Sequence, residues 1–248
     1  MAILVTGASA GFGKSTCITL VKAGYKVIGA ARRLEKLNEL KQQLGDNFYP
    51  LQMDISNTVD IDKAIDSLPK QWSEIELLVN NAGLALGLEP AHQVKIEDWL
   101  TMVNTNIIGL IYLTRKILPQ MVERDKGHII NLGSIAGTYP YPGGNVYGAT
   151  KAFVKQFSLN LRADLSGTKV RVTNIEPGLC GGTEFSNVRF KGDDERAANL
   201  YKDTESIQPE DIANTILWIY QQPAHVNINR IEIMPISQSS NALKVVKH

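Results

Sequence analysis

The sequence is poor in cysteine and nearly balanced in charge. Its 248 residues include two cysteines, Cys17 and Cys180, which lie far apart without a CxxC pair or a neighbouring histidine. A disulfide framework and a structural zinc site are therefore excluded, and a reducing compartment is expected. The 26 Lys and Arg residues face 25 Asp and Glu residues, so the net charge is +1 and no long block of one sign occurs. This balance argues against a nucleic-acid or membrane-surface partner.

Long hydrophobic runs and a secretory leader are also missing. The longest uncharged stretches, 99–114 and 127–150, are interrupted by asparagine, glycine and proline, so neither is expected to span a bilayer as a helix. The segment before Lys14, the first basic residue, is too short for a signal peptide, which predicts a cytoplasmic protein. The four histidines have no metal-ligand spacing to one another, so no metal site is expected.

Short apolar, β-branched runs alternate with amphipathic segments of helical length along the whole chain. The predicted strands are 3–6, 26–31, 48–52, 77–80, 128–132, 170–175 and 228–233, and the predicted helices are 13–23, 34–44, 59–68, 96–123, 145–165 and 209–220. This alternation predicts an α/β Rossmann-type fold over residues 1–248, a single domain whose doubly wound, seven-stranded parallel sheet has helices on both faces. Ligands of such sheets bind outside the carboxyl ends of the strands. The long segment 178–206 lies at that end and is predicted to be a substrate lid.

A glycine-rich turn follows the first predicted strand. It reads Thr6-Gly7-Ala8-Ser9-Ala10-Gly11-Phe12-Gly13 and leads into a helix, so its backbone can approach a pyrophosphate at the helix N-terminus. The spacing does not fit a P-loop, although Gly13-Lys14-Ser15 has the right letters, and it does not fit GxGxxG. It fits Thr-Gly-x-x-x-Gly-x-Gly, with a helix start and chance glycines as the alternative.

Two arginines, Arg32 and Arg33, end the second predicted strand. An NAD site places an acidic residue there for the ribose 2′-hydroxyl. An arginine fork instead holds a 2′-phosphate through charge-assisted hydrogen bonds of roughly 1.5–3 kcal/mol each, whereas a carboxylate repels it. The pair therefore predicts NADP as the cofactor, with two solvated arginines at a helix start as the alternative.

Ser134, Tyr147 and Lys151 form the candidate catalytic set. Ser134 follows the fifth predicted strand, and a spacing of four places Tyr147 and Lys151 on one helical face. Oxidation of an alcohol needs a base, and a free tyrosine with a pKa of about 10 is a poor one at neutral pH. A lysine charge at roughly 5 Å stabilises the phenolate by about 3 kcal/mol, so we expect Lys151 to lower the pKa of Tyr147. Ser134 is expected to donate to the substrate oxygen. Taken alone, the same spacing also fits a surface pair.

Together these motifs resemble the short-chain dehydrogenase/reductase family along essentially the whole chain. The resemblance implies that Asn106, inside an apolar predicted helix, completes the catalytic set with Ser134, Tyr147 and Lys151. One residue more than is usual in the family separates Gly178 from Thr183. The cofactor contacts that it implies are Gly7, Ser9, Ala10, Gly11, Phe12 and Gly13 in the turn, Arg32 and Arg33 after the second strand, Asp54 and Ile55 at the adenine, Asn81, Ala82 and Gly83 at the adenosine ribose, and Tyr147, Lys151, Pro177, Gly178, Leu179 and Thr183 at the nicotinamide end.

Three stretches, 83–87, 143–147 and 177–190, resemble one bacterial subgroup in particular, the NADP-dependent 3-hydroxy acid dehydrogenases, which act on serine and allo-threonine and reduce malonic semialdehyde. The resemblance implies a small 3-hydroxy acid or semialdehyde substrate and a homotetramer. We expect Ser134 and Tyr147 to hold the reacting oxygen and Arg189 to hold the carboxylate, with a solvated loop charge as the alternative for Arg189. Carbonyl and 3-oxoacyl reductases share the catalytic set. A P-loop phosphotransferase and a catalytically silent NADP-binding protein are the alternatives from other classes.

Overall fold

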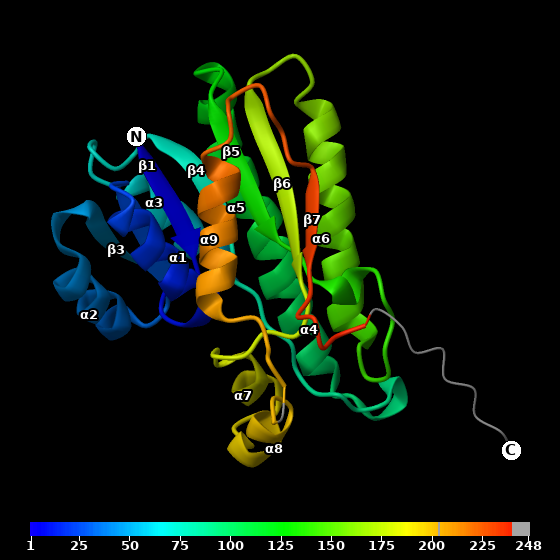
Figure 1. Ribbon diagram of the computed structural model, residues 1–248. Helices are drawn as coiled ribbons and strands as arrows, with labels where there is room; N and C mark the ends of the chain where they lie inside the picture. Colours follow the sequence, from blue (N-terminus) through cyan, green and yellow to red (C-terminus); the bar gives the residue numbers. More distant parts are fainter. Residues whose placement is uncertain (203, 240–248) are drawn as a thin grey trace, which may run out of the picture.

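The computed structural model describes residues 1–202 and 204–239, which form one seven-stranded sheet in the order β3-β2-β1-β4-β5-β6-β7. Every neighbouring pair of strands is parallel, and helices cover both faces (Figure 1). The predicted doubly wound α/β fold is therefore confirmed. The strands are β1 (Ala2–Thr6), β2 (Val27–Ala31), β3 (Phe48–Gln52), β4 (Ile75–Asn80), β5 (Gly127–Leu132), β6 (Val170–Pro177) and β7 (Arg230–Ile233).

Two hydrophobic cores lie on opposite faces of the sheet, because successive side chains of a strand point to opposite sides. In β1, Ile3 and Val5 belong to the core under α1, α2 and α9, while Ala2 and Leu4 belong to the core under α3, α5 and α6. All five residues of β1 are buried, which explains why its sequence is a continuous apolar run. The helices are α1 (Gly11–Lys22), α2 (Leu34–Leu44), α3 (Thr58–Asp66), α4 (Ile96–Val103), α5 (Leu110–Glu123), α6 (Asn145–Asp164), α7 (Phe185–Arg189), α8 (Asp194–Asn199) and α9 (Pro209–Tyr220).

The predicted helix over 96–123 is present with these bounds, but it is not α-helical throughout, because a π-helical turn at Asn104–Gly109 separates α4 from α5. Asn106 lies in this turn, and its side-chain amide bonds both the N–H and the C=O of Leu84. At Gly109, a Cβ atom would lie 2.1 Å from the carbonyl oxygen of Ile55, so the helix approaches that loop too closely for a side chain. Single π-helical turns inside α-helices are often found at functional sites.

The segment 178–206 contains two short helices, α7 and α8, rather than an irregular loop. In Figure 1 both helices lie below the carboxyl ends of the strands, as one small unit beside the sheet. No helix among residues 1–202 and 204–239 is both long and apolar enough to cross a membrane.

Candidate active site

A cavity of about 880 Å³ opens at the carboxyl ends of the central strands, where the fold predicts a ligand site. The turns after β1, β2, β4 and β5 line one side, and the segment 178–206 lines the other. Among the residues singled out from the sequence, those that line the cavity are Gly7, Ser9, Ala10, Gly11, Phe12, Arg32, Arg33, Asp54, Ile55, Asn81, Ala82, Gly83, Ser134, Tyr147, Lys151, Pro177, Gly178, Leu179, Thr183 and Arg189. Gly13 and Asn106 are not part of this lining and lie behind it.

The glycine-rich turn has a backbone that only glycine adopts without strain. Gly7 and Gly11 have positive φ angles of 69° and 50°, and a Cβ atom on Gly13 would lie 2.2 Å from the carbonyl oxygen of Gly7. The N-cap of α1 is Ala10, which has no side-chain acceptor, so it caps none of the first N–H groups of the helix. Ala10, Gly11 and Phe12, at this end of the helix, line the cavity. This cradle fits the pyrophosphate of a dinucleotide.

A second turn, Asn81-Ala82-Gly83 after β4, is fixed directly to the glycine-rich turn. The Thr6 hydroxyl accepts hydrogen bonds from the backbone N–H groups of Asn81 and Ala82 at 3.0 and 2.9 Å. The Asn81 amide donates to the carbonyl oxygen of Thr6 at 2.8 Å. The ends of β1 and β4 are therefore held as one rigid wall of the cavity.

Arg32 and Arg33 differ in their surroundings although they are neighbours. The Arg33 guanidinium donates to the Ser9 hydroxyl and forms a two-point ion pair with Glu184. The Arg32 guanidinium has no hydrogen-bond or ion-pair partner within residues 1–202 and 204–239, and it is exposed at the cavity edge. After β3, Asp54 accepts from the N–H and the hydroxyl of Ser56 at 2.9 and 2.7 Å.

The structure brings Ser134, Tyr147 and Lys151 together at the other end of the cavity. Tyr147 and Lys151 lie on one face of α6 and are 8% and 7% exposed, with the lysine Nζ 5.8 Å from the centroid of the tyrosine ring. Lys151 Nζ donates to the carbonyl oxygen of Leu132 at 2.7 Å. Ser134 caps a 3₁₀ turn after β5, where its hydroxyl accepts from the N–H of Ala136 at 3.1 Å.

Asn106 lies behind Ser134, Tyr147 and Lys151 and bonds α6, the helix that carries Tyr147 and Lys151. Its amide donates to the hydroxyl of Thr150 at 3.1 Å, and Thr150 precedes Lys151 in α6. A Cβ atom on Gly83 would meet Asn106 Oδ1 at 3.2 Å and Lys151 Nζ at 3.5 Å. Asn106 therefore fixes the turn after β4 against α6, close to the lysine.

Burial is the dominant electrostatic effect at the site. It raises the pKa of Tyr147, while the hydrogen bond from Ser134 and the charge of Arg189 act in the opposite direction. Burial also lowers the pKa of Lys151 to about 8. We expected the charge of Lys151 to lower the pKa of Tyr147, but in the structure desolvation raises this pKa, and Lys151 is not among the groups that shift it. The tyrosine therefore holds its proton at neutral pH, as a proton donor to a carbonyl oxygen must.

Arg189 is a buried residue of the cavity rather than a solvated loop charge. It is 9% exposed, and its guanidinium carbon lies 5.6 Å from the ring centroid of Tyr147. Its Nε donates to the carbonyl oxygen of Gly87 at 3.1 Å, and its Nη2 donates to the hydroxyl of Tyr141 at 2.8 Å. The sequence analysis missed Tyr141 and also Phe185, whose ring centroid lies 5.7 Å from that of Tyr147.

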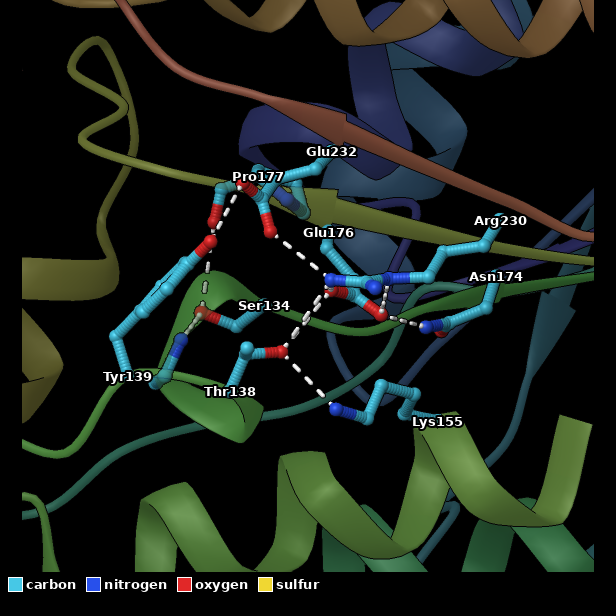
Figure 2. Close-up of polar contacts among 10 residues, drawn as sticks. Ser134, Thr138, Tyr139, Lys155, Asn174, Glu176, Pro177, Arg230 and Glu232 are labelled. Carbon is cyan, nitrogen blue, oxygen red and sulfur yellow. Dashed lines mark hydrogen bonds and ion pairs between the residues drawn. The ribbon is translucent and has the colours of Figure 1, made fainter. Parts of the chain in front are cut away.

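An ion pair with a buried carboxylate, close to Ser134 and Thr138, was also missed. Glu176 is fully buried in β6, and both of its carboxylate oxygens accept from Arg230 of β7 at 2.7 and 2.8 Å. Figure 2 shows this pair beside Thr138, with Ser134 directed toward the carbonyl oxygen of Pro177. The only carboxylate in β6 is Glu176, but Arg171, Thr173 and Asn174 also lie in this strand, so the glutamate does not stand out in the sequence.

The P-loop alternative is not supported by the geometry. Ser15, the residue that would bind a magnesium ion in a P-loop, is buried inside α1, and its hydroxyl donates to Glu210 at 3.3 Å. Within the described residues, no group of three or more His, Cys, Asp or Glu side chains could hold a metal ion.

Comparison with known proteins finds dehydrogenases that match this chain over nearly its full length. A sequence model of the short chain dehydrogenase family matches residues 1–194. A probable NADP-dependent dehydrogenase of Haemophilus influenzae is 64% identical, over 98% of this chain and 97% of its own. The NADP-dependent 3-hydroxy acid dehydrogenase YdfG of Escherichia coli K12 is 59% identical, over 99% of both chains. The serine 3-dehydrogenase of Rhizobium radiobacter is 53% identical, over 99% of this chain and 98% of its own.

Solved structures lead to the same group. A closed form of serine dehydrogenase complexed with NADP+ superposes with a TM-score of 0.99 at 58% identity, and all of both chains is covered. Serine dehydrogenase from Escherichia coli superposes with a TM-score of 0.86 at 54% identity, over 96% of this chain and all of that one.

Proposed function

The chain belongs to the short-chain dehydrogenase family, and we propose that it transfers a hydride between NADP and the 3-hydroxyl group of small 3-hydroxy acids. The observation that carries this proposal is the buried ring of Tyr147 with two cations, Lys151 and Arg189, within 5.8 and 5.6 Å of its centroid. One cation serves the proton transfer, and the other matches a carboxylate on the substrate. The names of the relatives, which include serine 3-dehydrogenase and NADP-dependent 3-hydroxy acid dehydrogenase, support the same substrate class.

We propose that the glycine-rich turn and the N-terminus of α1 hold the pyrophosphate of NADP, and that Arg32 and Arg33 hold its 2′-phosphate. Asp54 and Ile55 would flank the adenine, and Asn81, Ala82 and Gly83 would line its ribose. Pro177, Gly178, Leu179 and Thr183 would contact the nicotinamide end, with Lys151 on the ribose there. The nicotinamide accepts or returns the hydride when the cofactor is bound.

The side chains of this protein then have separate tasks. Tyr147 moves the proton to or from the substrate oxygen, and Ser134 donates a hydrogen bond that orients this oxygen. Lys151 stabilises the phenolate that forms, and Asn106 positions the helix that carries the lysine. The pKa of Lys151, lowered to about 8, still leaves it protonated at neutral pH. The positive charges of Lys151 and Arg189 favour the phenolate when the alcohol is oxidised.

Arg189 would hold the substrate carboxylate under a lid formed by the segment 178–206. Two of its nitrogen atoms already bond Gly87 and Tyr141, which fixes the guanidinium and leaves Nη1 for the substrate. Serine, allo-threonine and 3-hydroxypropionate carry a carboxylate at the same distance from the reacting carbon, and malonic semialdehyde is the oxidised partner of 3-hydroxypropionate. We propose all of these as substrates.

We further propose one cytoplasmic catalytic domain over residues 1–248 that works as a homotetramer. Apolar side chains remain exposed on α4 and α6, where Ile96 and Leu100 are each 54% exposed and Phe153 and Leu159 are each 38% exposed. Such a patch suits a contact between copies of the chain. Equilibrium sedimentation would test the assembly, and a monomer at micromolar concentration would contradict it.

The decisive assay follows NADP reduction by absorbance with L-serine, L-allo-threonine, 3-hydroxypropionate and a plain secondary alcohol. Each substrate is repeated with NAD and with the Tyr147→Phe variant. We expect turnover of the three carboxylate-bearing alcohols with NADP, and a loss of about 100- to 10,000-fold in kcat for the variant without weaker NADPH binding. Turnover of the plain alcohol alone would favour the alternative, a carbonyl or 3-oxoacyl reductase. NADPH binding without any turnover would favour a catalytically silent protein.

A further inference from the structure

One side chain connects three parts of the cofactor end of the cavity. Arg33 follows β2, and its Nε and Nη2 donate to the hydroxyl of Ser9 in the glycine-rich turn at 3.3 and 3.0 Å. Its Nη1 and Nη2 donate to the two carboxylate oxygens of Glu184 at 3.2 and 2.8 Å. The guanidinium is thus shared between the turn and the segment 178–206.

This arrangement changes the charge that a 2′-phosphate meets. Arg32 and Arg33 carry two positive charges, but the Glu184 carboxylate cancels one of them at direct contact. The side chains of Arg33 and Glu184 are 42% and 54% exposed, so the pair is open to solvent and can rearrange. A phosphate ester carries between one and two negative charges at neutral pH. Glu184, which is also negative, already occupies Arg33, one of the two arginines that we propose for the 2′-phosphate.

Glu184 also lies at the start of α7 in the segment 178–206. It directly precedes α7, the helix that carries Phe185 and Arg189. The preceding residue, Thr183, packs on the glycine-rich turn, since a Cβ atom on Gly11 would lie 3.1 Å from its methyl carbon. The contact between Glu184 and Arg33 therefore ties the start of α7 to the cofactor end of the site.

We propose that Glu184 is a specificity-determining residue, which competes with the 2′-phosphate of the cofactor for Arg33 and so limits the preference for NADP over NAD. The inference rests on the proposed use of NADP. Couplings between two binding events are reciprocal. If the contact between Arg33 and Glu184 weakens phosphate binding by a given factor, a bound phosphate weakens this contact by the same factor. Arg32, which has no partner among the described residues, is then the arginine that holds the phosphate without competition.

The test replaces Glu184 by glutamine, which keeps an acceptor of the same shape and removes the charge. The dissociation constants of NADPH and NADH are measured by fluorescence titration of the full chain at low ionic strength. We expect Glu184→Gln to tighten NADPH binding by about two- to fivefold, the range for an exposed ion pair, and to leave NADH within about a factor of two. The tightening is expected to shrink as salt is added.

Two further variants separate this explanation from a general charge effect. Glu39 is a similarly exposed carboxylate that pairs with Lys36 at 3.1 Å and does not bond Arg33. Glu39→Gln removes the same charge and is expected to change both dissociation constants by less than about a factor of two. In an Arg33→Met background, Glu184→Gln should have no remaining effect on NADPH, because the two residues act through one contact.

Weaker or unchanged NADPH binding in Glu184→Gln would overturn the inference, as would equal tightening of NADH or an effect that persists without Arg33. The proposed function is decided separately, by wild-type turnover of 3-hydroxy acids with NADP. If that turnover is present while Glu184→Gln fails to tighten NADPH, the inference alone is wrong. If the wild-type protein shows no preference for NADPH over NADH, the proposed cofactor is wrong and the inference is rejected with it.

Discussion

The guanidinium of Arg189 lies against the aromatic ring of Tyr147, 5.6 Å from its centroid, and both side chains are almost wholly buried. A cation so close to Tyr147, the residue that we propose for proton transfer, has two expected effects. It opposes the rise in the pKa of Tyr147 that burial causes, and it attracts an anionic substrate to the reacting groups. The arginine comes from α7, in the segment 178–206, and the tyrosine from α6, so the site is complete only when this segment lies over the cavity.

Arg189→Met should separate acidic from neutral substrates. Loss of a charge-assisted hydrogen bond to the carboxylate is expected to raise the KM for L-serine by about 10- to 100-fold. The KM for an uncharged β-alcohol should change far less, because that substrate has no carboxylate to hold. Steady-state kinetics on both substrates provides the comparison.

Lys191→Met is the matched control for this prediction. Lys191 lies two residues further along the chain, but its ammonium pairs with Asp98 at 2.7 Å rather than lining the cavity. We expect normal KM values for both substrates in this variant. An equal rise in KM for charged and uncharged substrates in Arg189→Met would mean that the arginine only supports the segment 178–206.

Lys151→Met is expected to inactivate the protein and at the same time to stabilise it. Burial lowers the pKa of Lys151 from 10.5 to about 8, so below pH 8 a charged lysine in the folded state costs about 3 kcal/mol of the free energy of unfolding. Methionine avoids this cost, although it leaves the carbonyl oxygen of Leu132 without its present donor. Urea unfolding at pH 7 should show a gain of about 1–2 kcal/mol.

The gain should disappear at high pH, which is the specific sign of a buried charge. Between pH 8 and 10.5 the folded wild-type protein releases the proton of Lys151 while the unfolded chain keeps it, so wild-type stability rises relative to the variant. Lys155→Met, at a lysine one turn further along α6 whose ammonium is not buried, is the control for the substitution itself. A constant difference between wild type and Lys151→Met from pH 7 to 10 would contradict the explanation.

Much of the fold and of the site was predictable because the signals are local. Apolar runs of strand length, separated by amphipathic segments, predicted the parallel sheet, and the turn after β1 has glycines where Gly7 and Gly11 require positive φ angles. Ser134, Tyr147 and Lys151 are placed at the cavity by a strand end and by the helical repeat, both of which are visible in the sequence. These patterns need no knowledge of distant contacts.

The parts that were missed depend on contacts between distant segments. The π-helical turn at Asn104–Gly109 reflects the bonds of Asn106 to Leu84 and the close approach of Gly109 to Ile55. The raised pKa of Tyr147 reflects burial, which requires the packed structure. The pairing of Arg33 with Glu184 joins residues 151 positions apart, and no spacing rule connects them.

Removing Arg230 should lower the free energy of unfolding more than neutralising Glu176, its ion-pair partner. Glu176 is fully buried, whereas the Arg230 side chain is 38% exposed. Arg230→Met leaves an uncompensated buried carboxylate and is expected to cost about 3–5 kcal/mol in urea unfolding. Glu176→Gln leaves an arginine that water can reach, so its cost should be smaller, and the double variant should be more stable than Arg230→Met alone. Equal costs for the two single variants would show that the carboxylate is solvated.

His128 should make the protein sensitive to mild acid. Its ring is 1% exposed, its Nε2 contacts the hydroxyl of Thr173 at 2.9 Å, and its Nδ1 has no partner among the described residues. Burial, and to a smaller extent the charge of Arg171, hold its pKa well below the ordinary value of 6.5. Below pH 6.5 the unfolded chain therefore binds a proton that the folded protein does not, and stability falls as the pH falls.

His128→Gln removes this titration and provides the test. One proton corresponds to a slope of about 1.4 kcal/mol per pH unit, so the difference in the free energy of unfolding between wild type and variant should shift by that amount per unit below pH 6. Above pH 7 the difference should be constant, because the histidine is neutral in both states. His225→Gln, at an exposed histidine in the loop before β7, is the control for the substitution itself. If the free energy of unfolding fell with the same slope below pH 6 in wild type and in His128→Gln, His128 would become protonated without unfolding.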